Sequence, residues 1–461
     1  MLAASNTRSQ QVDAQRAPPP AVDERIDELS ADIVIIGGGP GGSTAGALLV
    51  QKGWRVLLLE KDRHPRFHIG ESLLPMGLPL FEQMGCAAAI EKVGLVKHSV
   101  QFHSTEHRAS QTFAFADAWD GVPKYAYQVR RSEFDHALLQ HARGRGVEVI
   151  ESCRAGNVRF EPDQVIVEAT CDDGRRVRAS ARYLIDATGR ETFMASRLGI
   201  KRKNPKHTSA ALYGHFRNAQ RNAGDAEGDI EIYWFAHGWM WFIPLADGST
   251  SVGAVCWPYY LKTRDTDPST FFLRTLQTCP ALWARVKDAA LIEPATATGN
   301  YSYTSDRMAG DRFVMIGDAF AFVDPVFSSG VYLAMNSAQF AADVVDGALR
   351  DPSAAARLNR AFERRVRRGL KTFTWMIYRM TSPVMRNLIM QPRDIFGIQR
   401  GVISFLAGDV YDSGPVRRRV MLFRGIYYLS ALKHWRSAWH SVLNRRDAIR
   451  PQAICSTDGS G

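Results

Sequence analysis

Long apolar runs are missing from this 461-residue chain. No apolar run of eighteen or more residues occurs without interruption by a charged residue, and residues 1–30 contain no apolar segment of the kind found in signal peptides. We therefore expect a cytoplasmic protein without a transmembrane segment. Residues 1–30 are polar and include three consecutive prolines, so we expect a disordered arm there and a disordered tail at 451–461.

Cysteine is also scarce, and its spacing shows no pattern. None of the six cysteines belongs to a Cys-x-x-Cys or Cys/His motif. This spacing supports neither a disulfide framework nor a zinc site, and no other metal site is indicated. We expect all six to be reduced thiols, namely Cys86, Cys153, Cys171, Cys256, Cys279 and Cys455.

Acidic residues are few in one region. The whole chain has a net charge of +11, and residues 361–450 contain 18 Lys or Arg against 5 Asp or Glu, a balance of +13. The rest of the chain is therefore close to neutral. The basic region predicts either a solvated helical surface or a docking face for an acidic partner. Nucleic acid is not expected, because no nucleic-acid-binding motif accompanies the charge.

A nucleotide-binding pattern is present in residues 31–62, ADIVIIGGGPGGSTAGALLVQKGWRVLLLEKD. A short apolar strand leads into Gly37, Gly39 and Gly42, a helical segment follows, and a second strand ends in Glu60. In this motif Gly37 permits a tight turn, Gly39 lets the backbone approach a pyrophosphate, and Gly42 lets helix and strand pack closely. The helix N-terminus favours phosphate, and Glu60 suits a ribose hydroxyl.

Two later segments decide which dinucleotide is expected. Residues 183–190, YLIDATGR, form a strand that enters a glycine turn, and Gly317 and Asp318 precede a long helical segment. An acid placed like Asp318 can hold a ribityl or pyrophosphate-side hydroxyl, so the set of segments favours FAD. A second Gly-x-Gly-x-x-Gly is absent from the sequence. We therefore expect no dedicated nicotinamide domain, and a separate flavin reductase as the source of reduced flavin.

These segments together resemble the single-component FAD enzymes related to aromatic hydroxylases. Within that superfamily, three segments resemble the flavin-dependent halogenases: RFHIGESLLP at 66–75, GWMWFIP at 238–244 and DPVFSSGV at 324–331. The family motif Trp-x-Trp-x-Ile-Pro matches Trp239, Trp241, Ile243 and Pro244 without a gap. Because alternate side chains of a strand point the same way, the two indoles are expected to form one wall. The resemblance implies that this wall keeps the substrate away from the flavin.

The resemblance implies a reaction in which FAD, as FADH2, and oxygen convert chloride or bromide into hypohalous acid. A halide needs converging backbone N–H groups in a dry pocket. The resemblance assigns this role to the amides of Ser329 and Gly330, which stand at the start of a helical segment. The alternative is an ordinary glycine turn that opens a helix.

The family also has a lysine that captures hypohalous acid on its way to the substrate. By resemblance this is Lys97 in GLVKHSVQFH, although His98 falls at the same place if no gap is allowed. A partly desolvated ammonium has a lowered pKa, so it offers a donor and, once deprotonated, a nucleophilic amine. The alternative is a solvated surface charge. A further flavin contact is assigned to Arg131, or to Arg130 beside it, in the segment RRSEFD.

One departure from the family narrows the expected substrate. The enzymes that act on free tryptophan carry a glutamate between the Asp-Pro pair and the halide turn, and this chain has Phe327 there. We therefore expect a phenolic or pyrrolic group, tethered to an acyl carrier protein. Carrier proteins are acidic, and the basic region offers two clusters that could steer one. They are Arg364, Arg365, Arg367 and Arg368, then Arg417, Arg418 and Arg419.

The expected architecture is α/β, with a Rossmann-type FAD domain of discontinuous segments, an antiparallel β-sheet substrate region and a C-terminal helical region. The FAD domain is placed at 31–200 and 300–345 with inserted segments, the sheet at 201–299 and the helices at 346–450. A halogenase of an aromatic group is the leading functional hypothesis. Two alternatives are an FAD-dependent aromatic hydroxylase, which should not need the indole wall, and a flavin-binding partner protein without turnover.

Overall fold

The computed structural model describes residues 26–204, 207–299, 302–433 and 435. The predicted tail 451–461 and most of the predicted arm lie outside these residues. The last five residues of the arm do not, and for them the prediction of disorder is wrong. They form β1 (Ile26–Ser30), which pairs in parallel with β11 (Arg176–Ala181). The Arg178 guanidinium lies 2.8 Å from the Glu28 carboxylate and secures this edge strand. Among the described residues, no helix is both long and apolar enough to cross a membrane.

The first layer is a sheet that, within the described residues, has six strands. In spatial order they are β21 (Ala309–Gly310), β22 (Phe313–Met315), β12 (Tyr183–Asp186), β2 (Ile33–Ile36), β3 (Val56–Leu59) and β8 (Glu148–Ile150). All neighbours pair in parallel except β21 with β22. Every residue of β2, β3 and β12 is buried, as expected for parallel strands covered on both faces. These strands and their helices confirm the predicted α/β fold.

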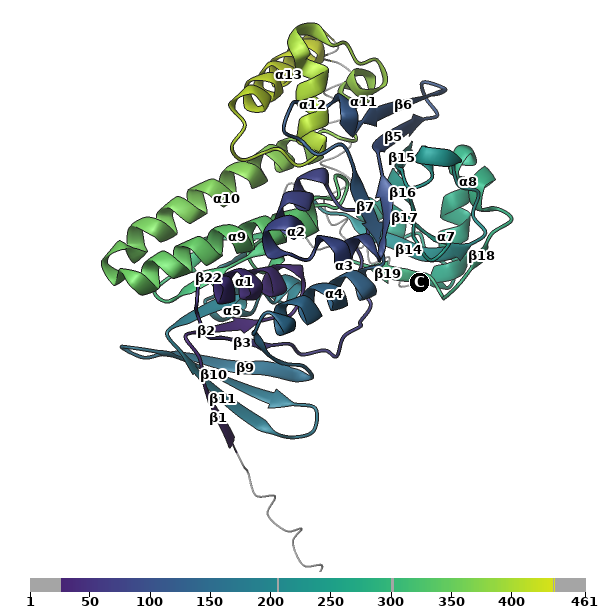
Figure 1. The fold of residues 1–461 in the computed structure, drawn as a ribbon. Coiled ribbons are helices and arrows are strands. Elements are labelled where there is room, and N and C mark those ends of the chain that lie inside the picture. Colours follow the sequence, from purple (N-terminus) through teal and green to yellow (C-terminus); the bar gives the residue numbers. More distant parts are fainter. Residues whose placement is uncertain (1–25, 205–206, 300–301, 434, 436–461) are drawn as a thin grey trace, which may run out of the picture.

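Two different layers cover this sheet. Helices α1 (Pro40–Gln51), α4 (Arg131–Gly144) and α9 (Ser329–Arg350) lie on one side, as Figure 1 shows. On the other side lies a smaller sheet of β1, β11, β10 (Val165–Cys171) and β9 (Cys153–Phe160). Shorter helices and strands complete this half: α2 (Leu78–Met84), α3 (Ala87–Glu91), α5 (Phe193–Arg197), β4 (Gly94–Lys97), β7 (Ala126–Val129), β13 (Lys201–Lys203), β20 (Tyr303–Ser305) and β23 (Ala321–Phe322).

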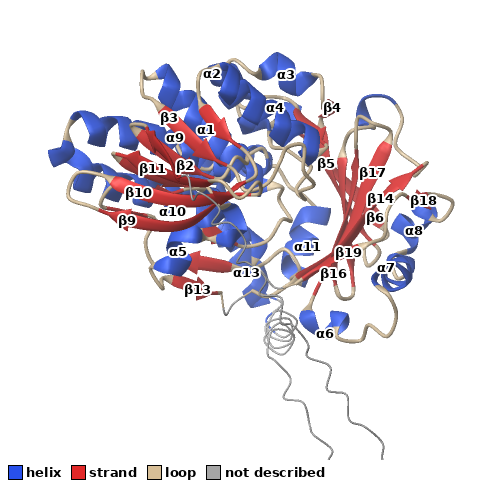
Figure 2. Cartoon of the chain, turned by 90° about the horizontal axis from the view of Figure 1, so that it is seen from below, coloured by secondary structure: helices blue, strands red, loops and turns tan. Residues whose placement is uncertain are grey.

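A second, mostly antiparallel sheet stands beside the first (Figure 2). Its described strands are β18 (Ala290–Leu291), β14 (Ala210–Arg217), β17 (Ser249–Cys256), β16 (Gly238–Pro244), β15 (Ile230–Phe235), β5 (Ser99–Ser104) and β6 (Ala109–Ala114), with β19 (Thr296–Thr298) against β14. β5 and β6 come from a segment inserted within residues 31–200. One face packs on α7 (Pro268–Gln277) and α8 (Pro280–Val286), and α6 (Pro258–Leu261) follows β17. The other face turns toward the FAD-domain half.

Helices follow α9 along the rest of the described chain. They are α10 (Ala355–Ile377), α11 (Pro383–Met390), α12 (Ile398–Leu406) and α13 (Gly414–Lys433). Pro383 occupies the first turn of α11, where its missing N–H costs nothing, and the Ser382 hydroxyl accepts the Met385 N–H as a cap. Residues 434 and 436–450 of the predicted helical region lie outside the described residues.

The expectation of six reduced cysteines is wrong for one pair. Cys153 begins β9 and Cys171 ends β10, and the register of the two strands places them opposite each other. The structure joins them as a disulfide. Strand pairing, which the sequence spacing alone does not reveal, brings them together. Cys86, Cys256 and Cys279 are free thiols and buried, and Cys455 lies outside the described residues.

Candidate functional site

A cavity of about 450 Å³ lies between the two halves of the molecule. Its lining comes from the carboxyl ends of the parallel strands, from β14, β15 and β16, and from the first turn of α9. This volume falls in the range of small-molecule and cofactor sites. It brings together eleven residues singled out in the sequence: Gly37, Gly39, Glu60, Arg131, Trp239, Trp241, Ile243, Gly317, Asp318, Ser329 and Gly330. Gly42, Lys97, His98 and Pro244 are not part of the lining.

The glycine turn between β2 and α1 has the close contacts expected of a dinucleotide cradle. Gly37 has a φ of +105°, and a Cβ there would overlap the Ala187 carbonyl. A Cβ on Gly42 would overlap the Gly37 carbonyl, so Gly42 serves the packing of the turn, outside the cavity. Glu60 follows β3 and accepts the backbone N–H of Gly38 through Oε2. Burial raises the pKa of the Glu60 carboxyl, although the hydrogen bonds from backbone N–H groups act in the opposite direction.

Asp318 lies in a short helical turn, Gly317–Ala319, directly after the strand end at Ile316. Its carboxyl group is half-buried in the cavity wall, and desolvation raises its pKa to about 6 despite the positive charges of Arg131 and Arg190. No described residue donates a hydrogen bond to this carboxylate. A desolvated carboxylate without a donor lacks the partner that such groups normally have. The hydroxyls of a ribityl chain would supply it, so the residues present fit FAD.

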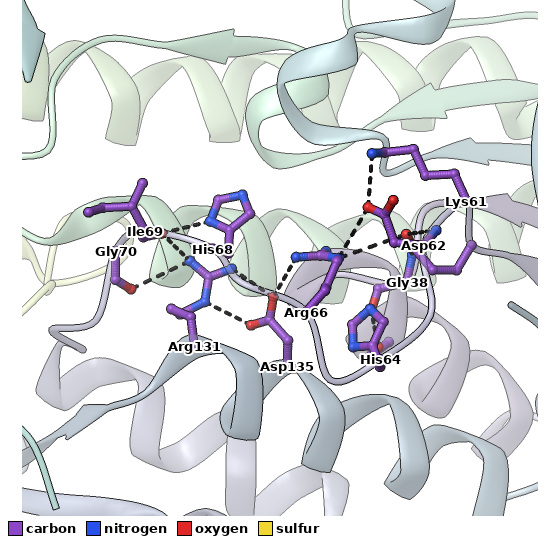
Figure 3. A network of polar contacts seen from close by, with 12 residues as sticks. Gly38, Lys61, Asp62, His64, Arg66, His68, Ile69, Gly70, Arg131 and Asp135 are labelled. Atoms are coloured by element: carbon purple, nitrogen blue, oxygen red, sulfur yellow. Dashed lines mark hydrogen bonds and ion pairs between the residues drawn. The ribbon is translucent and has the colours of Figure 1, made fainter. Parts of the chain in front are cut away.

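A chain of ion pairs holds the loop that crosses the cavity, residues 62–71 (Figure 3). The Arg131 guanidinium contacts both Asp135 oxygens, at 2.7 and 2.9 Å, and donates to the Ile69 carbonyl at 2.7 Å. Burial disfavours ionisation of Asp135, but Arg131 outweighs it and lowers the pKa of that carboxyl. Arg131 also lowers the pKa of His68 to about 4, with help from burial. Arg131 also lines the cavity, and its hydrogen bonds hold Asp135 and this loop in place.

The two indoles occupy the cavity face of β16. Trp239, Trp241 and Ile243 alternate with Met240 and Phe242, which enter the core under α7 and α8. The ring centres of Trp239 and Trp241 are 5.9 Å apart. The neighbouring strand makes room for them, because Gly253 lies opposite Trp241 and a Cβ on it would overlap the indole. Trp241 Nε1 donates to Ser251 Oγ at 3.1 Å and fixes the orientation of its ring.

The turn before α9 exposes helix N–H groups to the cavity. Ser328 has a φ of +53° and ends the preceding loop, and Ser329 begins a helix of 22 residues. The first N–H groups of a helix have no partner within it and attract anions. Phe327 turns away from the cavity, and its ring meets the edge of Phe405 at 5.7 Å. The substitution noted in the sequence therefore fills the core beside α12.

Asp324 anchors the same turn from the other side. Its Oδ2 accepts hydrogen bonds from His207 Nε2 at 2.7 Å and from Ser209 Oγ at 3.0 Å. Its Oδ1 accepts the Val326 N–H at 3.1 Å. These contacts fix the approach of the chain to Ser329 and tie it to the segment that leads into β14.

Lys97 ends β4 and is fully buried. Its Nζ donates to Ser72 Oγ at 2.9 Å and to the Leu73 carbonyl at 2.7 Å. Burial lowers its pKa to about 7, while Asp229 acts in the opposite direction. Ser72 lines the cavity, so Lys97 reaches it through a serine hydroxyl. His98 is exposed at the surface beside it.

Several lining residues have no role in the sequence analysis. Glu71 and Ser72 belong to the Gly-Glu-Ser segment, whose resemblance to the family assigns no function to either side chain. Tyr213 and Phe67 add aromatic surface near Trp241. The alternation of β14 is a signal for Tyr213, but its neighbours across the sheet are not visible in the sequence.

Comparisons with known proteins show the family to which the chain belongs. The model of a family described as "FAD binding domain" matches residues 30–375, so the chain belongs to that class of FAD-binding proteins. The chain is 31% identical over 408 residues to the 1H-pyrrole-2-carbonyl-[peptidyl-carrier protein] chlorinase of Pseudomonas fluorescens, covering 83% of this chain and 90% of that protein. It belongs to the flavin-dependent halogenase family, and it is an enzyme that uses FAD, as FADH2, and a halide.

Solved structures show the same fold. The myxobacterial chondrochloren halogenase CndH, a variant of the FAD-dependent halogenases, matches with a TM-score of 0.73 and 29% identity, over 91% of this chain and 97% of that one. A flavoprotein/dehydrogenase from Cytophaga hutchinsonii has a TM-score of 0.81 at 24% identity, over 88% of this chain and 100% of that one. The latter likeness concerns the fold alone.

Proposed function

We propose that this halogenase acts on an electron-rich phenolic or pyrrolic ring presented by an acyl carrier protein. The observation that carries the proposal is the wall of Trp239, Trp241 and Ile243, which lines the same cavity as the nucleotide cradle and Ser72. Such a wall allows the oxidant to be made on one side and used on the other. The position of Phe327, away from the cavity, argues against the free-tryptophan branch.

The residues that would hold FAD are the turn Gly37–Gly42, Glu60 and Asp318. When bound and reduced, FAD supplies two of the four electrons that reduce oxygen, and the halide supplies the other two and becomes hypohalous acid. The amides of Ser329 and Gly330 would hold the halide, because they open a long helix whose dipole favours an anion. Asp324 keeps this turn in place through its bonds to His207 and Ser209.

Lys97 would hold hypohalous acid through Ser72. Ser72 Oγ accepts the hydrogen bond of Lys97 Nζ, and its own proton has no acceptor among the described residues. That proton is therefore available to the oxygen of hypohalous acid, and the charge behind it strengthens the bond. The leaving oxygen then departs as hydroxide or water while the halogen passes to the ring.

The carrier protein is proposed on two grounds. The Pseudomonas fluorescens relative is named for a pyrrole carbonyl group on a peptidyl carrier protein. The exposed side chains of Arg364, Arg368 and Lys371 recur at helical spacing along α10, and Arg417 and Arg418 are exposed on α13. This basic surface suits an acidic partner.

Two arginines of the predicted cluster are engaged within the protein. Arg365 forms an ion pair with Asp412, and Arg367 donates to the Asp306 carbonyl at 2.7 Å. We therefore place the docking function on the exposed members of the cluster. A separate flavin reductase is the second proposed partner, because the chain has one Gly-x-Gly-x-x-Gly motif.

The experiment combines the purified protein with a flavin reductase, NADH, FAD and chloride or bromide. The substrates are a panel of phenols and pyrroles, each offered free and as the thioester of a carrier protein. Mass spectrometry should show replacement of hydrogen by halogen, with the carrier-bound form favoured. A hydroxylated product in the presence of halide would contradict the halogenase chemistry. Equal rates for free and tethered forms would contradict the carrier.

A further inference from the structure

Glu71, a buried acid of the cavity wall, forms a pair with His215. Neither residue has a proposed role in holding the flavin, the halide or hypohalous acid. Glu71 is 2% exposed and lines the cavity, and its Oε1 lies 2.8 Å from His215 Nε2. His215 projects from β14 on the same face as Tyr213, two residues before it. Glu71 Oε2 has no hydrogen-bond partner among the described residues.

The pair stands among aromatic rings. Phe67 stacks on Tyr213 with ring centres 6.2 Å apart and meets His215 edge-on at the same distance. Tyr213 in turn lies 6.2 Å from Trp241. Phe67 is 54% exposed although it lines the cavity, so a face of its ring is available to a ligand. An aromatic substrate gains offset or edge-on ring contacts at such a place.

Glu60 and Asp324, two other acids of the cavity, differ from Glu71 in the hydrogen bonds that they already make. Glu60 accepts backbone N–H groups of the nucleotide turn. Asp324 accepts hydrogen bonds on both oxygens, from His207, Ser209 and Val326. Asp318 lies next to Gly317 at the strand end, where it would hold the cofactor. Glu71, which lines the cavity, has one oxygen bonded to a histidine and one without a hydrogen-bond partner among the described residues, as a base requires.

Glu71 also precedes Ser72, the residue through which Lys97 reaches the cavity. The halogen donor and the proton acceptor would therefore stand on consecutive residues of one loop. Backbone bonds hold this loop, since the Val129 N–H donates to the Glu71 carbonyl at 2.8 Å and the Leu73 N–H to the Tyr127 carbonyl at 2.9 Å. This arrangement fixes both groups against the same bound ring.

We propose that Glu71, oriented by His215, is the base that removes the proton from the ring carbon that is halogenated. The inference rests on the proposed function. In the step, the carbon–halogen bond forms as the oxygen–halogen bond of hypohalous acid breaks, and the hydroxide takes the Ser72 Oγ proton, which Lys97 Nζ replaces. The carbon–hydrogen bond then breaks, its electron pair restores the aromatic ring, and the proton passes to Glu71. The two protein groups exchange protons with solvent, so arene and hypohalous acid give haloarene and water.

Glu71 thus takes the place of the carboxylate that Phe327 replaces. The chain supplies a matched control on the opposite face of the same sheet. Glu231 is also buried and also pairs with a histidine, since its Oε2 lies 2.8 Å from His103 Nε2, but it faces α7 and α8 and does not line the cavity. Glu231 also pairs with Arg285 and accepts the Tyr233 hydroxyl, so Glu231→Gln disturbs at least as many buried contacts as Glu71→Gln without touching the site.

The test compares turnover of an arene with that of the same arene deuterated at the halogenated position. The ratio of the two rates on one enzyme stock does not depend on how much of a variant is folded. Wild type and Glu231→Gln should show a ratio near unity, because ring attack limits turnover. Glu71→Gln should lose about 100-fold in kcat and show a clear deuterium effect, because proton removal becomes slow. FAD binding, followed by flavin fluorescence, should be unchanged in both variants.

Three outcomes overturn parts of the account in different ways. An active Glu71→Gln with no deuterium effect would overturn the role of Glu71 as the base. A slow Glu71→Gln without a deuterium effect would assign it a structural role and overturn the proposal equally. If wild type halogenates no phenol or pyrrole, while a diffusible β-diketone trap is halogenated, the proposed function fails and this inference fails with it.

Discussion

Lys97 Nζ donates a hydrogen bond to Ser72 Oγ at 2.9 Å, and Ser72, not Lys97, lines the cavity. The lysine is therefore one hydroxyl away from the space where the substrate would lie. Its burial keeps the ammonium out of water, which lowers its pKa to about 7. This relationship leads to tests of the lysine, the wall and the cofactor site.

The first prediction concerns stability and pH. Lys97 titrates near pH 7 in the folded protein and near 10.5 when unfolded. Below pH 7 both states are protonated and the buried charge lowers stability in full. Between pH 7 and 10.5 Lys97 is neutral in the folded state but protonated in the unfolded state, so the destabilisation by the buried charge decreases as the pH rises. Above pH 10.5 Lys97 is neutral in both states and the destabilisation is absent. Lys97→Met should therefore raise the free energy of unfolding on the order of a few kcal/mol below pH 7. Urea unfolding at several pH values measures this, and a gain independent of pH would contradict it.

The second prediction concerns the indole wall. Gly253→Ala forces a methyl group into the Trp241 ring. It should lower the free energy of unfolding by roughly 1–3 kcal/mol and increase the fraction of reduced flavin consumed without product. Gly156→Ala is the control, because its Cβ would meet the Glu168 carbonyl oxygen at an ordinary 3.7 Å. Equal effects of the two substitutions would show that the wall has no special role.

The third prediction concerns Asp318. Its pKa of about 6 means that FAD affinity should weaken as the pH falls through 6, because only the ionised carboxylate accepts two hydroxyls well. Asp318→Asn should bind FAD about tenfold or more weakly at pH 8 and lose this pH dependence. Fluorescence titration measures both effects. Asp306→Asn, at a surface ion pair with Arg202, should bind like wild type. A variant of Asp318 with unaltered affinity would remove it from the cofactor site.

The fourth prediction concerns the basic stripe of α10. Reversing Arg364, Arg368 and Lys371 to glutamate should raise the KM for a carrier-bound substrate at low salt and leave that for the free substrate unchanged. The difference should shrink as salt screens the charges. Lys262 and Arg264 are exposed on the far side of the second sheet, and their reversal serves as the control. If the control raises KM as much, the effect belongs to net charge rather than to a docking surface.

The sequence predicts those parts of the site that depend on local order. The glycine turn, Glu60 and the alternation of Trp239 and Trp241 each arise within one short segment, and the structure places them around one cavity. Contacts between segments that lie far apart in the sequence could not be predicted from such local patterns. Glu71 and His215 lie 144 residues apart and meet only because the loop 62–71, which crosses the cavity, brings Glu71 against β14. The Cys153–Cys171 pair depends in the same way on the register of β9 and β10.

The indole wall shows both what a local sequence pattern predicts and what it leaves open. Its period of two predicts that both rings share a face, but a buried core strand has the same period. The structure distinguishes a cavity wall from a buried core strand, since Trp239 and Trp241 line the cavity while Met240 and Phe242 enter the core. The role of Ser72 between Lys97 and the cavity depends on side-chain packing and had no signal in the sequence.

The most direct test of the account measures two products of Lys97→Met in one reaction. The protein, a flavin reductase, halide and oxygen are supplied with an aromatic substrate and a diffusible β-diketone trap. We expect halogenation of the arene to be lost and that of the trap to continue at the wild-type rate, because Lys97 directs the oxidant but does not make it. Flavin fluorescence should confirm unchanged FAD binding. A variant that still halogenates the arene at the wild-type rate would contradict the account and move the role to another residue, with His98 the first to examine.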